Sequence, residues 1–187
     1  VEEYSEAKLK EAIPVLKSIM VEQPYDFASK AQQICAEAGV KLIYTQCLPK
    51  APIGGSTRWI NGIPCIQISG RQKRYDIYWF TLFHEIGHIL LHGKKDIFLE
   101  DDNYSDEELT KENEANNYAS NILLSQMDEE SIIESGKFSP ISIRQYAARF
   151  NTHPSVIVGR LQHRHAIPFS KDNSLLIKID LFQKAEA

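Results

Sequence analysis

Residues 79–92 read WFTLFHEIGHILLH, a nearly continuous apolar segment that contains His84, Glu85, His88 and His92. Apolar residues occur on almost every face that this segment would present as a helix, which predicts a helix buried on most of its sides. Burying His84, Glu85 and His88 in such a helix costs several kcal/mol for each group unless a partner satisfies it. The segment therefore predicts a buried helix with a polar site near its middle.

The spacing of these polar residues is the His-Glu-x-x-His pattern of zinc sites. His84 and His88 are four residues apart, so both imidazoles lie on one face of a helix and can reach one metal ion. Glu85 then lies to the side, where it can accept a proton from a metal-bound water. The alternative is a pair of core histidines held by hydrogen bonds to the backbone or to carboxylates. We predict a metal site with Glu85 as the general base.

A catalytic zinc site takes three protein ligands and leaves the fourth position to water. Residues 111–119 (KENEANNYA) supply two candidates for the third ligand, and helical geometry separates them. Glu112 falls on the apolar stripe of this helix, whereas Glu114 lies about 200° away from it and should face solvent. Glu112 is therefore the predicted third ligand, and Asn116, one turn on, is expected to orient a ligand through a hydrogen bond.

Other polar residues near the motif are weaker candidates for ligands. His92 lies one turn beyond His88, beside a glycine, and we expect it to cap the helix or to contact a ligand rather than to bind the metal. The acidic loop that follows offers alternative carboxylates, although a charged run in a loop is usually solvated. These alternatives are Asp96, Glu100, Asp101 and Asp102.

The rest of the chain alternates helical and strand-like patterns, which predicts an α+β fold. Asn61-Gly62, between two apolar segments, is a strong signal for a type I′ hairpin, and Pro14 should bend or break the first helix. The expected helices cover residues 5–20, 26–38, 75–92, 106–127, 140–150 and 154–164, and the expected strands cover residues 40–45, 56–60, 63–69 and 173–181.

We expect these strands to form a small antiparallel sheet packed on the buried helix. Strand 63–69 is predicted to be the edge of that sheet beside the cleft, where an extended substrate could pair with it. Residues 1–187 are expected to form a single domain. Its parts would be an N-terminal helical linker (residues 1–22), a catalytic core (26–127) and a C-terminal helical pair (138–166).

Composition narrows the class of protein. The 187 residues are 43% hydrophobic and carry a formal net charge of −4, which argues against disorder and against general binding to nucleic acid or anionic membranes. We find no apolar run of the roughly 20 residues that a membrane helix needs. Cys35, Cys47 and Cys65 lack metal or disulfide spacing, so we expect reduced, buried thiols and a cytoplasmic location.

The two motifs together resemble the ImmA/IrrE family of zinc metallopeptidases. The segment at residues 79–92 matches the pattern H-E-x-G-H-x-x-x-H, and ENEANNYA at residues 112–119 is similar to E-x-E-A-N-x-F-A, with Tyr118 in place of Phe. The resemblance implies a zincin-like fold in which His84, His88 and Glu112 hold zinc and Glu85 is the general base. It is closest to the C-terminal half of HigA-like antitoxin regulators, which implies a helix-turn-helix domain upstream of Val1.

Two functions are compatible with these features. The first is a zinc-dependent endopeptidase that acts on a protein partner such as a repressor or regulator. The second is a transcriptional regulator or antitoxin domain that senses or binds a partner.

Residues 141–161 have a helix-turn-helix pattern and lie in the most basic part of the chain, but a helical pair that supports the metal domain explains the same pattern. We therefore expect DNA contact only through the upstream domain. A structural zinc site is disfavoured because such sites usually close all four positions, mostly with cysteine.

Overall fold

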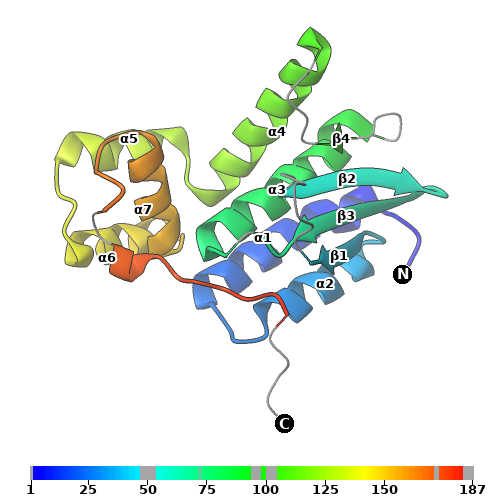
Figure 1. Ribbon diagram of the computed structural model, residues 1–187, viewed down its shortest axis with the longest axis horizontal. Helices are drawn as coiled ribbons and strands as arrows, with labels where there is room; N and C mark the ends of the chain where they lie inside the picture. Colours follow the sequence, from blue (N-terminus) through cyan, green and yellow to red (C-terminus); the bar gives the residue numbers. More distant parts are fainter. Residues whose placement is uncertain are drawn as a thin grey trace.

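Helix α3 (Tyr75–His92) is the central element of the computed structural model, which describes residues 2–46, 54–71, 73–93, 98–99, 105–170 and 173–182 (Figure 1). It contacts the sheet through β2 (Gly55–Ile60) and β3 (Ile63–Ser69), and it also contacts α4 (Asp106–Leu123) and α7 (Pro154–His163). The remaining elements are α1 (Glu6–Glu22), α2 (Phe27–Glu37), β1 (Lys41–Thr45), β4 (Phe98–Leu99), α5 (Gln126–Ser135), α6 (Pro140–Arg149) and the short 3₁₀ helix η2 (Asn173–Leu175). The predicted α+β class is confirmed.

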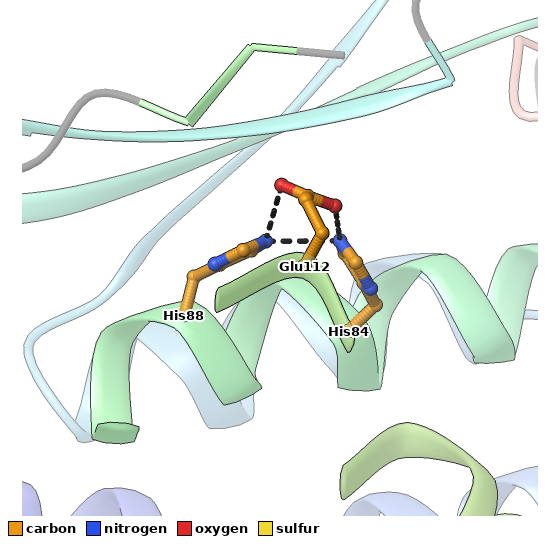
Figure 2. Close-up of side chains that lie close together, drawn as sticks. All are labelled: His84, His88 and Glu112. Atoms are coloured by element: carbon orange, nitrogen blue, oxygen red, sulfur yellow. Dashed lines mark hydrogen bonds and ion pairs between the residues drawn. The ribbon is translucent and has the colours of Figure 1, made fainter. Parts of the chain in front are cut away.

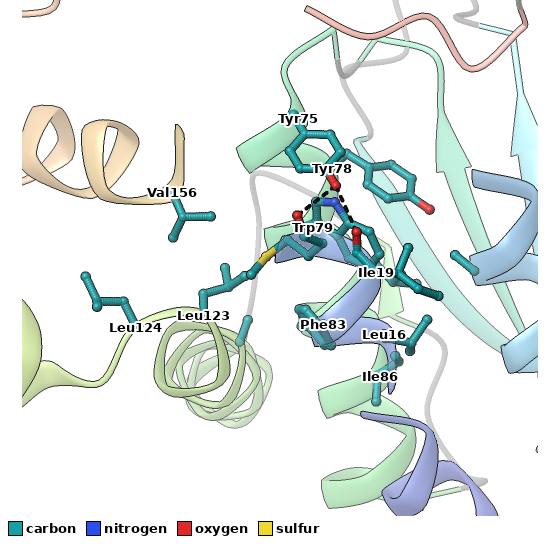
Figure 3. Close-up of a cluster of buried hydrophobic side chains, with 14 of the residues drawn as sticks. Leu16, Ile19, Tyr75, Tyr78, Trp79, Phe83, Ile86, Leu123, Leu124 and Val156 are labelled. Atoms are coloured by element: carbon teal, nitrogen blue, oxygen red, sulfur yellow. Dashed lines mark hydrogen bonds between the residues drawn. The ribbon is translucent and has the colours of Figure 1, made fainter. Parts of the chain in front are cut away.

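The core forms around α3, of which 13 of 18 residues are buried. Trp79 and Phe83 stack with ring centroids 5.9 Å apart, and Leu16 of α1 and Leu123 of α4 belong to the same cluster (Figure 3). Each large apolar side chain buried in this way contributes roughly 1.5–3 kcal/mol. The apolar character of residues 79–92 thus reflects a helix that is covered by neighbours along most of its length, as the sequence predicts.

The sheet has the strand order β1-β3-β2-β4. The β2–β3 hairpin is confirmed: Asn61 and Gly62 both have positive φ angles, 51° and 81°, as a type I′ turn requires. However, β1 pairs in parallel with β3, with Leu42 opposite Ile66, so the sheet is mixed and the prediction of an antiparallel sheet was wrong.

The predicted edge position of residues 63–69 was also wrong. Strand β3 lies inside the sheet, with β1 on one side and β2 on the other. From Cys65 to Ile68 both sides of its backbone therefore pair within the sheet, which leaves no free edge there for a substrate. The order of strands in a sheet depends on pairing between distant segments, and the pattern of residues within one strand carries no information about which strands flank it.

The ends of α1 and α4 differ from the prediction by more than one residue, and one helix is additional. Pro14 lies inside α1, which continues to Glu22, since a buried apolar stripe that includes Leu9 and Leu16 holds both halves against the core. The helix expected at residues 106–127 ends at Leu123, and Ser125 caps a separate helix, α5, by accepting a hydrogen bond from the backbone N–H of Asp128. Helix α5 was not predicted.

The C-terminal segment is not a strand of the sheet. Residues 173–175 form a 3₁₀ turn, and a single bridge joins Lys178 to Arg74, just before α3. The backbone N–H of Tyr75 donates to the carbonyl of Ile177 at 2.9 Å. The segment therefore tethers the start of α3 rather than extending a sheet.

The helices α5, α6 and α7 gather at one end of the molecule, away from β1 and α2 (Figure 1). Helices α6 and α7 agree with the predicted pair at residues 140–150 and 154–164, and Ala147, Val156 and Leu161 are buried. Cys35 and Cys65 are buried free thiols, whereas Cys47 falls outside the described residues. Among the described helices, none combines the length and the apolar character that crossing a membrane requires.

Candidate metal centre

The structure brings the side chains of His84, His88 and Glu112 together (Figure 2). The Nε2 atoms of the two histidines lie 3.0 Å apart. One carboxylate oxygen of Glu112 lies 3.3 Å from Nε2 of His84, and the other lies 3.2 Å from Nε2 of His88. Both histidines are buried, and Glu112 is half-buried.

These distances suit a bound metal ion. A tetrahedral zinc ion with bonds of about 2.0–2.1 Å holds neighbouring ligand atoms roughly 3.3 Å apart, close to the separations observed here. Two neutral imidazole nitrogens that face each other can share only one proton. A cation that accepts both lone pairs and also pairs with the carboxylate satisfies all three groups at once, so this donor set fits a divalent metal such as zinc.

Close packing of α3 against α4 places Glu112 over the two histidines. A Cβ atom at Gly87, between His84 and His88, would lie 3.3 Å from Cα of Ala115 and 3.2 Å from the ring of Tyr118, so glycine allows the helices to approach. Ala115 is fully buried in this contact, as its size predicts. The N-terminus of α4 is fixed by a capping box at Ser105, whose side chain accepts a hydrogen bond from the backbone N–H of Glu108.

The charge on Glu112 is stabilised by its neighbours. Burial acts to raise the pKa of Glu112, but hydrogen bonds from His84 and His88 outweigh it and lower the pKa to about 2. Burial also acts to lower the pKa of His84. Glu112, Glu85 and Asn116 together outweigh burial, so the pKa of His84 is raised. The pKa of His88 is lowered, first by burial, and the nearby His84 adds to this effect. The shifts of Glu112 and His88 thus favour an ionised carboxylate and a neutral imidazole, the forms in which these two groups bind a metal.

Glu85 points toward strand β2 from the helix turn that carries His84. Its carboxylate accepts a hydrogen bond from Oγ1 of Thr57 at 2.6 Å, and only 2% of its surface is exposed. Gly55, also on β2, leaves space for this group, because a Cβ atom there would lie 2.5 Å from Oε1 of Glu85. Sequence reasoning did not find Thr57, since the register of β2 on α3 depends on tertiary packing.

A chain of hydrogen bonds supports His88 from behind. Nδ1 of His88 lies 3.2 Å from Nδ1 of His92, and Nε2 of His92 lies 2.9 Å from a carboxylate oxygen of Glu114. If Nε2 of His88 binds a metal, its proton lies on Nδ1, which donates to Nδ1 of His92. The proton of His92 then lies on Nε2 and is donated to Glu114. His92 therefore contacts a predicted ligand, as expected. The side chain of Glu114 is 56% exposed, which agrees with its predicted position on the solvent side of the helix. Its carboxylate nevertheless forms a hydrogen bond with His92.

His84 has no comparable support in the described part of the chain. Its Nδ1 atom is buried and makes no hydrogen bond there. Asn116, which we expected to orient a ligand through a hydrogen bond, does interact with the predicted ligand His84: hydrogen bonding by its side chain raises the pKa of the imidazole. The alternative ligands Asp96, Glu100, Asp101 and Asp102 lie outside the described residues.

A family model for peptidase M78, described as the IrrE N-terminal-like domain, matches residues 35–161. This span covers well over half of the chain and includes His84, His88 and Glu112. The chain belongs to this family. The M78 match confirms the resemblance to ImmA/IrrE proteins seen in the sequence, and it extends from the end of α2 into α7. A comparison with curated proteins found no match.

Proposed function

We propose that the protein is a zinc-dependent endopeptidase. The observation that carries the proposal is the triad of His84, His88 and Glu112, with the carboxylate of Glu85 one residue from the first ligand. The name of the family is that of a peptidase, which points to the same chemistry. A buried metal-binding helix covered by a small sheet, with a third ligand on the next helix, is also the arrangement expected of a zincin-like domain.

In this proposal His84, His88 and Glu112 hold zinc, which when bound would supply a Lewis acid that polarises the peptide carbonyl and the attacking water. Glu85 accepts a proton from that water and delivers it to the leaving amine. The hydroxyl of Thr57 holds the Glu85 carboxylate in place. Burial of Glu85 keeps bulk water away from the carboxylate, which strengthens its electrostatic interactions.

The substrate that we propose is a protein in the cytoplasm, such as a repressor or another regulator. Direct contact of α6 and α7 with DNA is not part of the proposal. Helix α7 packs against α3, and Arg160, one of its basic residues, forms an ion pair with the buried carboxylate of Glu129. These contacts favour a supporting role for the pair of helices. DNA binding is proposed only for a helix-turn-helix domain upstream of this chain.

The decisive variant is Glu85→Gln, which removes the general base and keeps the shape of the side chain. We expect it to bind zinc like the wild type and to lose cleavage by about 10²-fold or more, the contribution typical of general acid–base catalysis. Cleavage is measured by adding each protein to a cell extract and identifying new protein termini by mass spectrometry. Termini that form equally with both proteins would contradict the role assigned to Glu85.

A further inference from the structure

A pocket of about 610 Å³ opens between α3, α4 and α7. This volume lies within the roughly 300–1,000 Å³ range of ligand pockets in proteins. Its walls come from all three helices, and the lining residues used below are Ile77, Phe80, Asn116, Ser120, Leu123 and Val156.

The pocket continues the metal centre along two helices. Phe80 and Ile77 lie four and seven residues before His84, so they occupy the helix face that carries the predicted ligands. The ring of Phe80 stacks on the imidazole of His84, with centroids 6.1 Å apart and planes 28° apart. On α4, Asn116 and Ser120 lie four and eight residues after Glu112, again on one face. A chain bound across the metal centre would therefore have this pocket directly beside it.

The inner wall of the pocket is apolar. Ile77 and Phe80 are only partly buried by the protein, and the pocket exposes their remaining surface, while Leu123 and Val156 close the wall behind them. Hydration of such an apolar surface is unfavourable. Covering it with another apolar group lowers the free energy by about 25 cal/mol for each Å² of surface buried. The wall therefore suits a large aliphatic or aromatic side chain.

The rim of the pocket at the end of α7 is basic. Two of its arginines are neutralised: Arg74 forms hydrogen bonds of 3.1 and 2.7 Å with Asp76, and Arg160 pairs with Glu129. Arg164 and His163 are exposed and form no ion pair with the described residues. The rim thus presents a positive charge that has no ion-pair partner among the described residues, which favours an acidic group on the ligand.

We propose that this pocket is a specificity subsite that receives a large apolar side chain of an extended peptide, with an acidic residue of the same peptide beside Arg164. The inference rests on the proposed function, since it assigns the ligand as a substrate of the adjacent metal centre. Binding to the pocket needs no turnover, however, so it can be measured separately from peptidase activity.

The test uses the zinc-loaded full chain with the substitution Glu85→Gln, and fluorescein-labelled peptides as probes. The reference peptide is Gly-Ala-Glu-Phe-Glu-Ala-Gly, and the comparison peptides replace either Phe with Ala or both Glu with Lys. Fluorescence anisotropy should show that the reference peptide binds about tenfold or more tightly than either comparison peptide. Equal affinity for the three peptides, or no binding of any, would overturn the proposal.

Two further substitutions locate the binding. Ser120→Trp fills the pocket and should weaken binding of the reference peptide about tenfold, whereas the matched control Asn121→Trp, on an exposed position of the same helix outside the pocket, should not. Arg164→Glu should reduce the preference for acidic peptides, unlike Lys137→Glu, which makes the same charge change on an exposed residue elsewhere. If Ser120→Trp binds like its control, the peptide sits elsewhere and the proposal fails.

These results separate the two proposals. Selective binding that depends on Ser120 and Arg164, together with no cleavage of any peptide or protein by the wild type, would support the subsite and contradict the peptidase. Cleavage that depends on Glu85 but shows no preference for a large apolar side chain, and no effect of Ser120→Trp, would support the peptidase and contradict the subsite.

Discussion

At the scale of single residues, the most informative feature of the site is the asymmetry between its two histidines. Nδ1 of His88 has a partner in His92, which in turn reaches Glu114, whereas Nδ1 of His84 has no hydrogen bond in the described part of the chain. An imidazole whose far nitrogen donates to a partner is held in one tautomer and one orientation. We therefore regard His88 as the better prepared of the two predicted ligands.

This asymmetry leads to a prediction for Glu114→Gln. The change removes the charge that His92 donates to, so the support of His88 weakens, and we expect zinc affinity to fall by roughly 10–100-fold. Affinity is measured by competition with a chromophoric chelator. The control is Glu107→Gln, which removes a charge from an exposed position of the same helix. A Glu114→Gln protein that binds zinc as tightly as this control would show that the hydrogen-bond chain does not support the site.

The predicted ligands follow from sequence because helical spacing alone brings them together. His84 and His88 share one face at i and i+4, and the apolar stripe of α4 turns Glu112 inward and Glu114 outward. Thr57 could not be found in this way. Its contact with Glu85 depends on how a strand lies across a helix that follows it by many residues, and no local pattern encodes that placement.

At the scale of elements, local signals determined which predictions succeeded. Helix α3 begins and ends at the predicted residues, Tyr75 and His92, because its apolar pattern and the glycine that follows it are unambiguous. The order of strands was not predicted, because β1 pairs with a strand that is distant in sequence. Helix α5 was missed because Ser125 caps it directly after α4, within what reads as one continuous helical pattern.

His153 links α1 and α7 and provides a test of how these two helices are held together. It is the N-cap of α7, and its Nε2 lies 3.1 Å from Oε1 of Gln23, the C-cap of α1. Burial, helped by Arg144 of α6, lowers the pKa of His153 to about 4. The folded protein therefore holds this imidazole neutral at pH values where the unfolded chain, with a pKa near 6.5, binds a proton.

Because the unfolded state binds the proton more readily, the free energy of unfolding should fall as the pH drops from about 6.5 to about 4, by up to roughly 2–3 kcal/mol. Above pH 6.5 this contribution is fully present. His153→Asn keeps a residue that can cap α7 and removes the titration. Urea unfolding in the presence of EDTA, at pH 7.5 and pH 5, should show a smaller loss in the variant than in the wild type. Equal losses would contradict this role for His153.

At the scale of the whole molecule, α3 carries the candidate site and the rest of the fold positions it. The sheet holds Glu85 through β2, helix α4 brings Glu112, and α7 closes the pocket next to the triad. The family match covers residues 35–161, yet α1 lies before it and buries Leu9 and Leu16 in the same core. The catalytic chemistry that we propose thus depends on contacts that extend beyond the matched region.

The central claim, that His84, His88 and Glu112 hold zinc, is tested most directly by metal content. We would measure it by plasma mass spectrometry on the wild type, Glu112→Ala and the control Glu107→Ala, each purified without chelators and then offered zinc. We expect about one zinc per chain in the wild type and the control, and a sharp loss in Glu112→Ala. A wild-type protein that binds no zinc, or a Glu112→Ala variant that retains it fully, would show that these three residues are not the zinc ligands.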